Sequence, residues 1–269
     1  MDRYTAAALQ LNSTPDLTRN LRAVEQGVRA ATGRGASLIV LPECSTFLGP
    51  EPRLLELLSD IESGGEELLS RLSRELQVCL IAGTYSRADD GRAYNTLLAY
   101  DRNGSEVARY RKIHLFDVNL PDEVRYEESR YIKPGACEAM LLQAEAFGTL
   151  GFSICYDLRF PELYRELSRL GADVLLIPAA FTEFTGRDHW EILLRARAIE
   201  NLAYVIAPAQ VGVHFGKRES HGHAMIIDPW GRILADVGKA PDAFALAEID
   251  PLTLAEARAR LPSLGHRRL

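Results

Sequence analysis

The sequence has few of the features that mark a membrane, secreted or nucleic-acid-binding protein. No apolar run among its 269 residues approaches the roughly 20 residues that a membrane-spanning helix requires. Only 4 cysteines occur, without a CxxC pair, which favours free thiols in a reducing compartment over a disulfide framework. The first residues contain no signal-peptide-like apolar stretch, so we expect a cytoplasmic protein.

Positive charge is also scarce. The chain has 31 Lys and Arg residues against 37 Asp and Glu residues, a formal net charge of −6. Nucleic-acid-binding proteins usually carry a basic stripe, whereas the only dense basic segment here is residues 266–268. With 47% hydrophobic and 25% charged residues, the composition is that of a globular protein. We therefore expect neither a nucleic-acid nor a membrane partner.

Apolar, often β-branched runs alternate with helical patterns along the whole chain. Apolar residues at helical spacing predict helices over 14–31, 66–77, 161–170 and 188–201. Thr14 is the predicted cap of the first helix, and Asp188 and Glu191 are expected to form a capping box for the last. The turn sequence Asp-Pro-Trp-Gly at 228–231 predicts a hairpin. The predicted strands are 5–11, 36–41, 78–84, 95–100, 106–111, 148–154, 173–178, 203–207, 223–228, 233–237 and 244–249.

This alternation predicts an α/β fold with mixed sheets and helices on their outer faces. The number of strands suits a two-sheet sandwich better than one eight-stranded barrel. No linker, low-complexity tract or clear internal repeat interrupts the pattern. We therefore expect a single domain over residues 1–269.

Cys155 is a candidate nucleophile because of its position in the sequence. The apolar segment 148–154 runs into it and a predicted helix follows, so its thiol lies at a strand-to-loop corner, where α/β folds place nucleophiles and ligands. A lone cysteine is more often a small core residue. The charged residues Asp157, Arg159 and Glu162 favour a site, because buried strands seldom end in so many charges.

Glu43 and Lys112 also close apolar segments. Taken singly, the first is typical of a solvated strand end and the second of an edge lysine. Together with Cys155 they supply the base, the oxyanion stabiliser and the nucleophile of thiol-based acyl transfer. The ordinary cysteine and glutamate pKa values differ by about four units, which opposes proton transfer in water by about 5.7 kcal/mol. We expect burial to raise the pKa of Glu43, and the ammonium to lower that of the thiol.

Several segments resemble the nitrilase (carbon–nitrogen hydrolase) superfamily. Residues 41–43 (Leu-Pro-Glu), 111–116 (Arg-Lys-Ile-His-Leu-Phe) and 155–162 (Cys-Tyr-Asp-Leu-Arg-Phe-Pro-Glu) are similar to its three signature segments, in the same order. The similarity continues through 189–200 and 222–231, and so covers nearly the whole chain. The resemblance implies an αββα sandwich, here a four-layer α/β fold, which commonly pairs into dimers. It also implies catalysis without a cofactor.

The resemblance further implies a role for each residue of the triad. Glu43 is expected to act as general base and then as acid, Lys112 to stabilise the tetrahedral oxyanion, and Cys155 to attack the substrate. The attack yields a thioester, which water activated by Glu43 then hydrolyses. The backbone N–H of Tyr156 is expected to be the second oxyanion donor, since it follows the nucleophile.

The family also has a second glutamate near the triad, in a segment that ends in Pro-Gly. Residues 124–135 offer two glutamates, Glu127 and Glu128. Glu128, directly before Ser129, fits the pattern better, and we place Glu127 on the surface. The implied role of Glu128 is to orient Lys112 and the substrate amide.

Within the superfamily, further segments are most similar to the deaminated glutathione amidases and to their relative, omega-amidase. The Ala-Gln-Val-Gly string at 209–212 and the Gly-His-Arg-Arg tail at 265–268 favour the first branch. This resemblance implies a small-molecule amide substrate that carries a carboxylate. The other segments that carry it are 159–162, 178–182 and 261–264.

Three residues are candidates for binding that substrate: Arg159, Phe181 and Thr182. Arg159 lies four residues after the nucleophile, and a guanidinium binds a carboxylate through two hydrogen bonds. An internal ion pair of Arg159 with Asp157 or Glu162 is an equally weighted alternative.

Other functions stay open at this point. One is omega-amidase activity on 2-oxoglutaramate or a related linear amide, and another is a catalytically idle binding partner. A third is a metal-dependent hydrolase built on His221 and His223. Two histidines with no third ligand at a suitable spacing are a weak metal signal, so we expect no metal.

Overall fold

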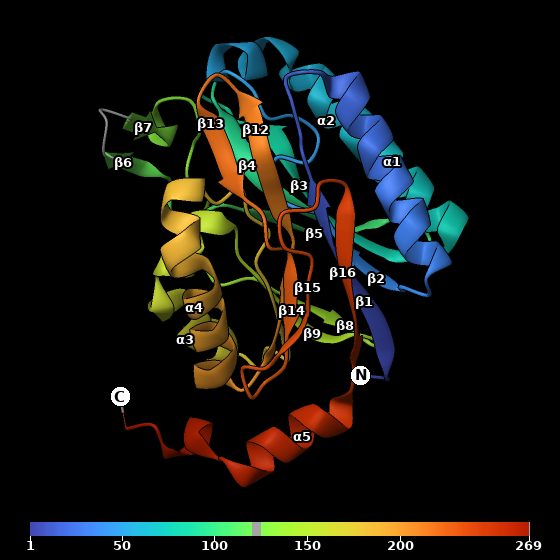
Figure 1. Ribbon diagram of the computed structural model, residues 1–269, viewed down its shortest axis with the longest axis vertical. Coiled ribbons are helices and arrows are strands. Elements are labelled where there is room, and N and C mark those ends of the chain that lie inside the picture. The colour runs from blue at the N-terminus through green and yellow to red at the C-terminus, as the bar shows by residue number, and fades with distance from the viewer. Residues whose placement is uncertain (120–124, 269) are drawn as a thin grey trace.

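Two mixed β-sheets pack face to face, and helices cover their outer faces (Figure 1). The computed structural model describes residues 1–119 and 125–268. The larger sheet consists of β1 (Tyr4–Leu11), β2 (Leu38–Val40), β3 (Cys79–Arg87), β4 (Ala93–Tyr100), β5 (Glu106–Arg111), β12 (Ala209–Phe215), β13 (Arg218–His221) and β16 (Ala243–Ile249). Its strand order is β13-β12-β1-β2-β3-β4-β5, and β16 pairs with β1.

The second sheet follows the order β15-β14-β11-β10-β9-β8. Its strands are β8 (Leu141–Ala144), β9 (Gly148–Phe152), β10 (Val174–Leu176), β11 (Tyr204–Ala207), β14 (Met225–Ile227) and β15 (Ile233–Asp236). A separate two-stranded hairpin joins β6 (Asp117–Asn119) to β7 (Arg125–Glu127).

The helices form the two outer layers. Helices α1 (Leu17–Gly33) and α2 (Glu51–Leu76) pack on the larger sheet, while α3 (Pro161–Arg169) and α4 (Glu183–Asn201) lie on the side of the second sheet (Figure 1). Helix α5 (Pro251–Arg260) lies outside these layers, near the C-terminus. Three short 3-10 helices complete the structure: Glu128–Arg130, Cys155–Arg159 and Ser263–His266.

Strand β1 shows how the sequence builds these layers. Its residues alternate between two cores: Ala6 and Ala8 face the core between the sheets, whereas Ala7 and Leu9 face the core under α1 and α2. Successive side chains of a strand point to opposite faces, so a strand buried on both faces is a continuous apolar run. The run predicted from the sequence at 5–11 therefore reflects burial on both sides.

The predicted two-sheet sandwich is confirmed, and each of the predicted strands is present. The hairpin at 228–231 is also confirmed: Asp228 Oδ1 accepts hydrogen bonds from the N–H groups of Trp230 and Arg232, and Gly231 has a φ of +81°. Strands β6, β7, β8 and β13 were not predicted, because each has only three or four residues. Strand β12 was also not predicted, although its apolar residues alternate with Gln210, Gly212 and His214.

Three predicted helix starts are wrong. Helix α1 is capped by Asp16, whose Oδ1 accepts a hydrogen bond from Arg19 N at 3.0 Å, and not by Thr14. Helix α2 begins fifteen residues before the predicted position 66, and Thr182 precedes the first residue of α4, so Asp188 lies within that helix. Within the described residues, no helix is both long and apolar enough to cross a membrane.

Candidate active site

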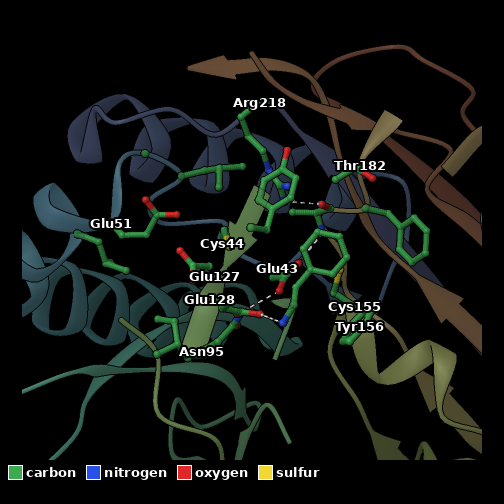
Figure 2. A pocket seen from close by; sticks show the side chains of 18 of the residues that line it. Glu43, Cys44, Glu51, Asn95, Glu127, Glu128, Cys155, Tyr156, Thr182 and Arg218 are labelled. Atoms are coloured by element: carbon green, nitrogen blue, oxygen red, sulfur yellow. Dashed lines mark hydrogen bonds between the residues drawn. The ribbon is translucent and has the colours of Figure 1, made fainter. Parts of the chain in front are cut away.

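The residues singled out from the sequence meet at the ends of strands. Cys155 follows β9, Glu43 follows β2 and Lys112 follows β5. All three side chains line one cavity of about 360 Å³, in which Figure 2 labels Glu43 and Cys155. Their exposed fractions are only 8%, 3% and 2%, so the cluster is shielded from bulk water. A cavity of this size falls within the range of small-molecule sites.

A network of hydrogen bonds holds Lys112 between two carboxylates. Its Nζ lies 3.0 Å from Glu43 Oε1 and 2.8 Å from Glu128 Oε2. Asn95 Nδ2 donates to Glu43 Oε1 at 2.7 Å and to Glu128 Oε1 at 3.2 Å. Ala180 N donates to the other oxygen of Glu43, at 2.7 Å. Each charged group is therefore fixed by more than one partner.

The two glutamates of the Pro-Gly segment have different surroundings. Glu128 contacts Lys112 and accepts a further hydrogen bond from Phe116 N at 2.6 Å. Glu127 instead pairs with Arg125, and its side chain is 46% exposed, against 16% for Glu128. Only Glu128 shares the lysine with Glu43.

The backbone at Cys155 is held in an uncommon conformation. Its φ is +46°, in the left-handed region that residues other than glycine rarely adopt, at a cost of roughly 1–3 kcal/mol. Cys155 N donates to Pro178 O at 2.9 Å, which ties the residue to the end of β10. Tyr156 lies in the first turn of the following 3-10 helix, where N–H groups lack an intrahelical partner. That N–H is thus available beside the thiol.

Asp157 holds this turn in place. Its fully buried carboxylate accepts hydrogen bonds from Ile154 N at 2.8 Å and from Tyr110 Oη at 2.7 Å. His114 adds contacts to the same carboxylate through its backbone N–H and Nδ1. The aspartate therefore links the Cys155 turn to β5 and to the segment after Lys112. From the sequence it was only one charge in a cluster.

The electrostatics of the cluster correct the expected pKa shifts. Burial alone disfavours the charged form of Glu43, but the Lys112 ammonium and hydrogen bonds from Cys155, Lys112 and Ala180 N lower its pKa below the usual value. Burial and the Glu43 carboxylate raise the pKa of Cys155 well above the usual value. Both shifts are opposite to the expectation, because Lys112 stabilises the Glu43 carboxylate and this carboxylate, together with burial, opposes ionisation of the thiol.

Lys112 itself stays charged in this environment. Burial opposes its charge, but the carboxylates of Glu128 and Glu43 raise its pKa well above the usual value. The resting cluster therefore consists of two carboxylates, one ammonium and a neutral thiol.

The predicted substrate-binding residues do not all lie at the cavity. Phe181 and Thr182 line it, and Thr182 immediately precedes α4. Arg159 is not among the lining residues: its Nη1 lies 3.3 Å from His189 Nδ1, and its guanidinium lies over the Phe181 ring. It forms no ion pair with Asp157 or Glu162, so the alternative of an internal ion pair is wrong, while the binding of substrate by Arg159 stays a prediction.

Two further residues reach the cavity without a clear signal in the sequence. Asn95 lies on β4 and contacts both carboxylates, and Arg218 enters from β13 (Figure 2). For Asn95, the only sequence indication of a functional role was a polar amide within a predicted strand, which is a weak one. Arg218 precedes no recognisable apolar pattern, and β13 itself was not predicted.

The two histidines considered as metal ligands bind separate carboxylates. His221 Nδ1 lies 3.1 Å from Glu183, and His223 Nδ1 lies 3.0 Å from Asp236. The two rings stack at 4.7 Å between centroids. Across residues 1–119 and 125–268, no three His, Cys, Asp or Glu side chains are grouped as a metal site requires.

Known proteins are similar to this chain over nearly its whole length. A deaminated glutathione amidase of Synechocystis sp. is 52% identical over 270 residues, which cover 99% of each chain. The solved structure of the Caenorhabditis elegans NitFhit protein has a TM-score of 0.92 and 38% identity, and the match covers 100% of this chain and 66% of that one. Saccharomyces cerevisiae Nit3, a member of the nitrilase superfamily, gives 0.89 and 28%, over 100% and 97% of the two chains. The family model for carbon–nitrogen hydrolases matches residues 5–259, and the chain belongs to this family.

Proposed function

We propose that this protein is an amidase that hydrolyses a small carboxylate-bearing amide, deaminated glutathione, through a thioester on Cys155. The observation that carries the proposal is the convergence of Glu43, Lys112, Glu128 and Cys155 on one buried cavity. The substrate is suggested by the relative that carries this name and shares 52% of its residues over the full length.

In the first step the sulfur of Cys155 attacks the amide carbon and the thiol proton passes to Glu43. The negative charge that develops on the amide oxygen is stabilised by the Lys112 ammonium and by the Tyr156 N–H. Glu43 then donates its proton to the leaving nitrogen, the C–N bond breaks, and a thioester remains. The amine product leaves the cavity.

In the second step Glu43 removes a proton from water, whose oxygen attacks the thioester carbon. Collapse of the new tetrahedral species releases the carboxylic acid and returns the proton to sulfur. Glu128 contacts Lys112 but does not face the thiol in this scheme; it holds the ammonium in position. Each proton that Glu43 accepts is thus given back within the same cycle.

The pKa directions decide how the proton moves. Because the pKa of Cys155 is raised and that of Glu43 is lowered, a preformed thiolate is disfavoured in the resting protein. In the proposed mechanism the proton therefore leaves the thiol as the C–S bond forms, when the charge passes to the oxygen beside Lys112. Activation depends on the substrate being present.

The test compares two amides that both yield 2-oxoglutarate. Release of this product from deaminated glutathione and from 2-oxoglutaramate is measured with the native protein and with Cys155→Ala. We expect faster release from deaminated glutathione and none above background in the variant, with an unchanged circular-dichroism spectrum. Activity retained by Cys155→Ala would overturn the mechanism. Preference for 2-oxoglutaramate would assign omega-amidase activity, and no release from either amide would favour an idle binding partner.

We also propose that residues 1–269 act as one domain and that the chain works in the cytoplasm as a homodimer. Exposed apolar side chains on and beside α4 support the pairing: Ile192 is 69% exposed, Trp230 48% and Ile199 44%. Contiguous exposed apolar side chains often mark an interface between proteins.

A further inference from the structure

Arg218 places a guanidinium in the candidate active site without a matching carboxylate. Its Nη2 donates to Ala180 O at 2.9 Å, and its guanidinium lies over the Tyr126 ring, 4.8 Å from the centroid. Its Nη1 is buried and has no hydrogen-bond partner among the described residues. Figure 2 shows Arg218 on the side of the cavity away from Asn95.

Two other arginines that are at least partly buried have carboxylate partners. Arg197 donates twice to Leu158 O and also pairs with Glu200, and Arg109 contacts Glu66. For Arg218, no carboxylate lies within ion-pair distance in the part of the chain that the structure describes. A charge withdrawn from water without a counterion is unfavourable, so an arginine kept in this state indicates a missing anionic partner.

Arg218 is connected to the proposed catalytic base through Ala180. Ala180 accepts a hydrogen bond from the guanidinium through its carbonyl and donates one to Glu43 through its N–H. One residue therefore links the arginine to the proposed base. The guanidinium lies over the ring of Tyr126, and its Nη1 makes no hydrogen bond to the described residues.

We propose that Arg218 binds a carboxylate of the substrate and thereby fixes the amide over Cys155. The inference rests on the proposed function, whose substrate carries one carboxylate on its acyl chain and another on its leaving group. A planar guanidinium matches a carboxylate through charge-assisted hydrogen bonds. Arg218 selects anionic amides, and Arg159, which does not line the cavity, does not supply this selection.

Binding is tested first, in a Cys155→Ala background that holds substrates without turnover. Three probes are titrated calorimetrically: deaminated glutathione, 2-oxoglutaramate, and pentanamide, which has no carboxylate. Arg218→Gln should weaken binding of at least one anionic amide by about 10- to 100-fold, the range for a lost charged hydrogen bond. Pentanamide binding should change by less than about threefold, because that probe offers no anion. Arg218→Lys, which keeps the charge, should recover part of the loss.

The two anionic probes distinguish the two carboxylates. A loss with both amides assigns Arg218 to the acyl chain, which they share. A loss with deaminated glutathione alone assigns it to the leaving group. Equal effects on all three probes would show a purely structural role and overturn the proposal, as would unchanged binding or a selective loss in Arg159→Gln instead. Thermal unfolding of each variant checks that the fold persists.

Kinetics of Arg218→Gln in the presence of Cys155 separate this proposal from the proposed function. If Arg218 binds the carboxylate, kcat/KM for the affected amide falls by a similar factor while the pentanamide rate is preserved. The exposed Arg169, which pairs with Glu166 on α3, provides Arg169→Gln as the matched control. Should the native protein release product from no amide, the proposed function fails, whereas the binding titrations still decide the role of Arg218.

Discussion

Lys112 is the residue on which the charges of the site converge. Its ammonium contacts Glu43 and Glu128 and has an exposed fraction of only 2%. In such a shielded place a fixed cation stabilises a developing oxyanion far more than it would in water. We predict that Lys112→Ala lowers kcat by about 10²- to 10³-fold, measured as 2-oxoglutarate release at saturating substrate.

The control for this prediction is Lys133→Ala. Lys133 pairs with Asp89 at the surface and does not line the cavity. Circular dichroism and thermal unfolding verify that Lys112→Ala is folded although its two carboxylates have lost their common counterion. A decrease in kcat of less than tenfold would tell against the oxyanion role.

At the scale of single residues, the sequence locates the side chains that stand at strand ends. Glu43, Lys112 and Cys155 each close a predicted strand, but each signal is weak when taken singly, and their combination and the resemblance to the nitrilase superfamily single them out. Asn95 and Arg218 escape this reasoning, because each depends on a partner in a distant segment. Asn95 binds Glu43, 52 residues away, and Arg218 binds a carbonyl 38 residues away. Such contacts follow from sheet order and register.

Strand β12 contains a histidine that should respond to pH. His214 is buried, and its Nδ1 contacts Ser13 O at 2.8 Å. Burial, with a smaller contribution from the Arg218 charge, lowers its pKa to about 4. Between pH 6.5 and 4 the unfolded chain therefore binds a proton that the folded protein excludes. Stability present above pH 6.5 is lost as the pH falls, by about 3 kcal/mol.

We predict that His214→Asn removes this part of the pH dependence. The free energy of unfolding is measured with urea at pH 7 and pH 4, and the loss between them should be about 3 kcal/mol smaller in the variant. His266→Asn, at an exposed position, should behave like the native protein. Equal losses in the native protein and His214→Asn would contradict the prediction.

At the scale of elements, the longer or more apolar strands were predictable, whereas among the predicted helix starts only that of α3 was right. Strands β1, β2, β10 and β11 are apolar runs buried on both faces, and such runs can be recognised in the sequence. Helix α2 was predicted only in its second half, because Gly64 and Gly65 weaken a helical pattern. The structure explains why a glycine is present at position 65, since a Cβ there would lie 3.1 Å from Thr46 Cγ2. Close packing thus overrides helix propensity at this point.

For the whole molecule, the exposed apolar side chains of α4 lead to a prediction about assembly. Ile192 and Ile199 are seven residues apart and so share one helix face, and Gly231, beside Trp230, approaches Ile199. If this face pairs two chains, a buried charge should separate them. We predict that the native protein is a dimer and that Ile192→Glu is a monomer, as determined by size-exclusion chromatography with light scattering.

A substitution on another face gives the comparison. Val213 on β12 is 58% exposed, so Val213→Glu introduces the same charge on a strand and not on α4, and should leave the mass unchanged. A monomeric native protein, or a dimeric Ile192→Glu, would be inconsistent with pairing through this helix.

The shared lysine has a consequence for the energetics of the whole cycle. Two carboxylates and one ammonium give the resting cluster a net charge of −1. When sulfur attacks, Glu43 becomes neutral and the new oxyanion carries the charge that Glu43 has lost, so the sum stays at −1. The reaction thus transfers negative charge from one flank of Lys112 to another without creating an additional ion. A cavity so closed to solvent does not have to stabilise a change in its total charge, so the surrounding protein dipoles need little reorganisation while the C–N bond breaks.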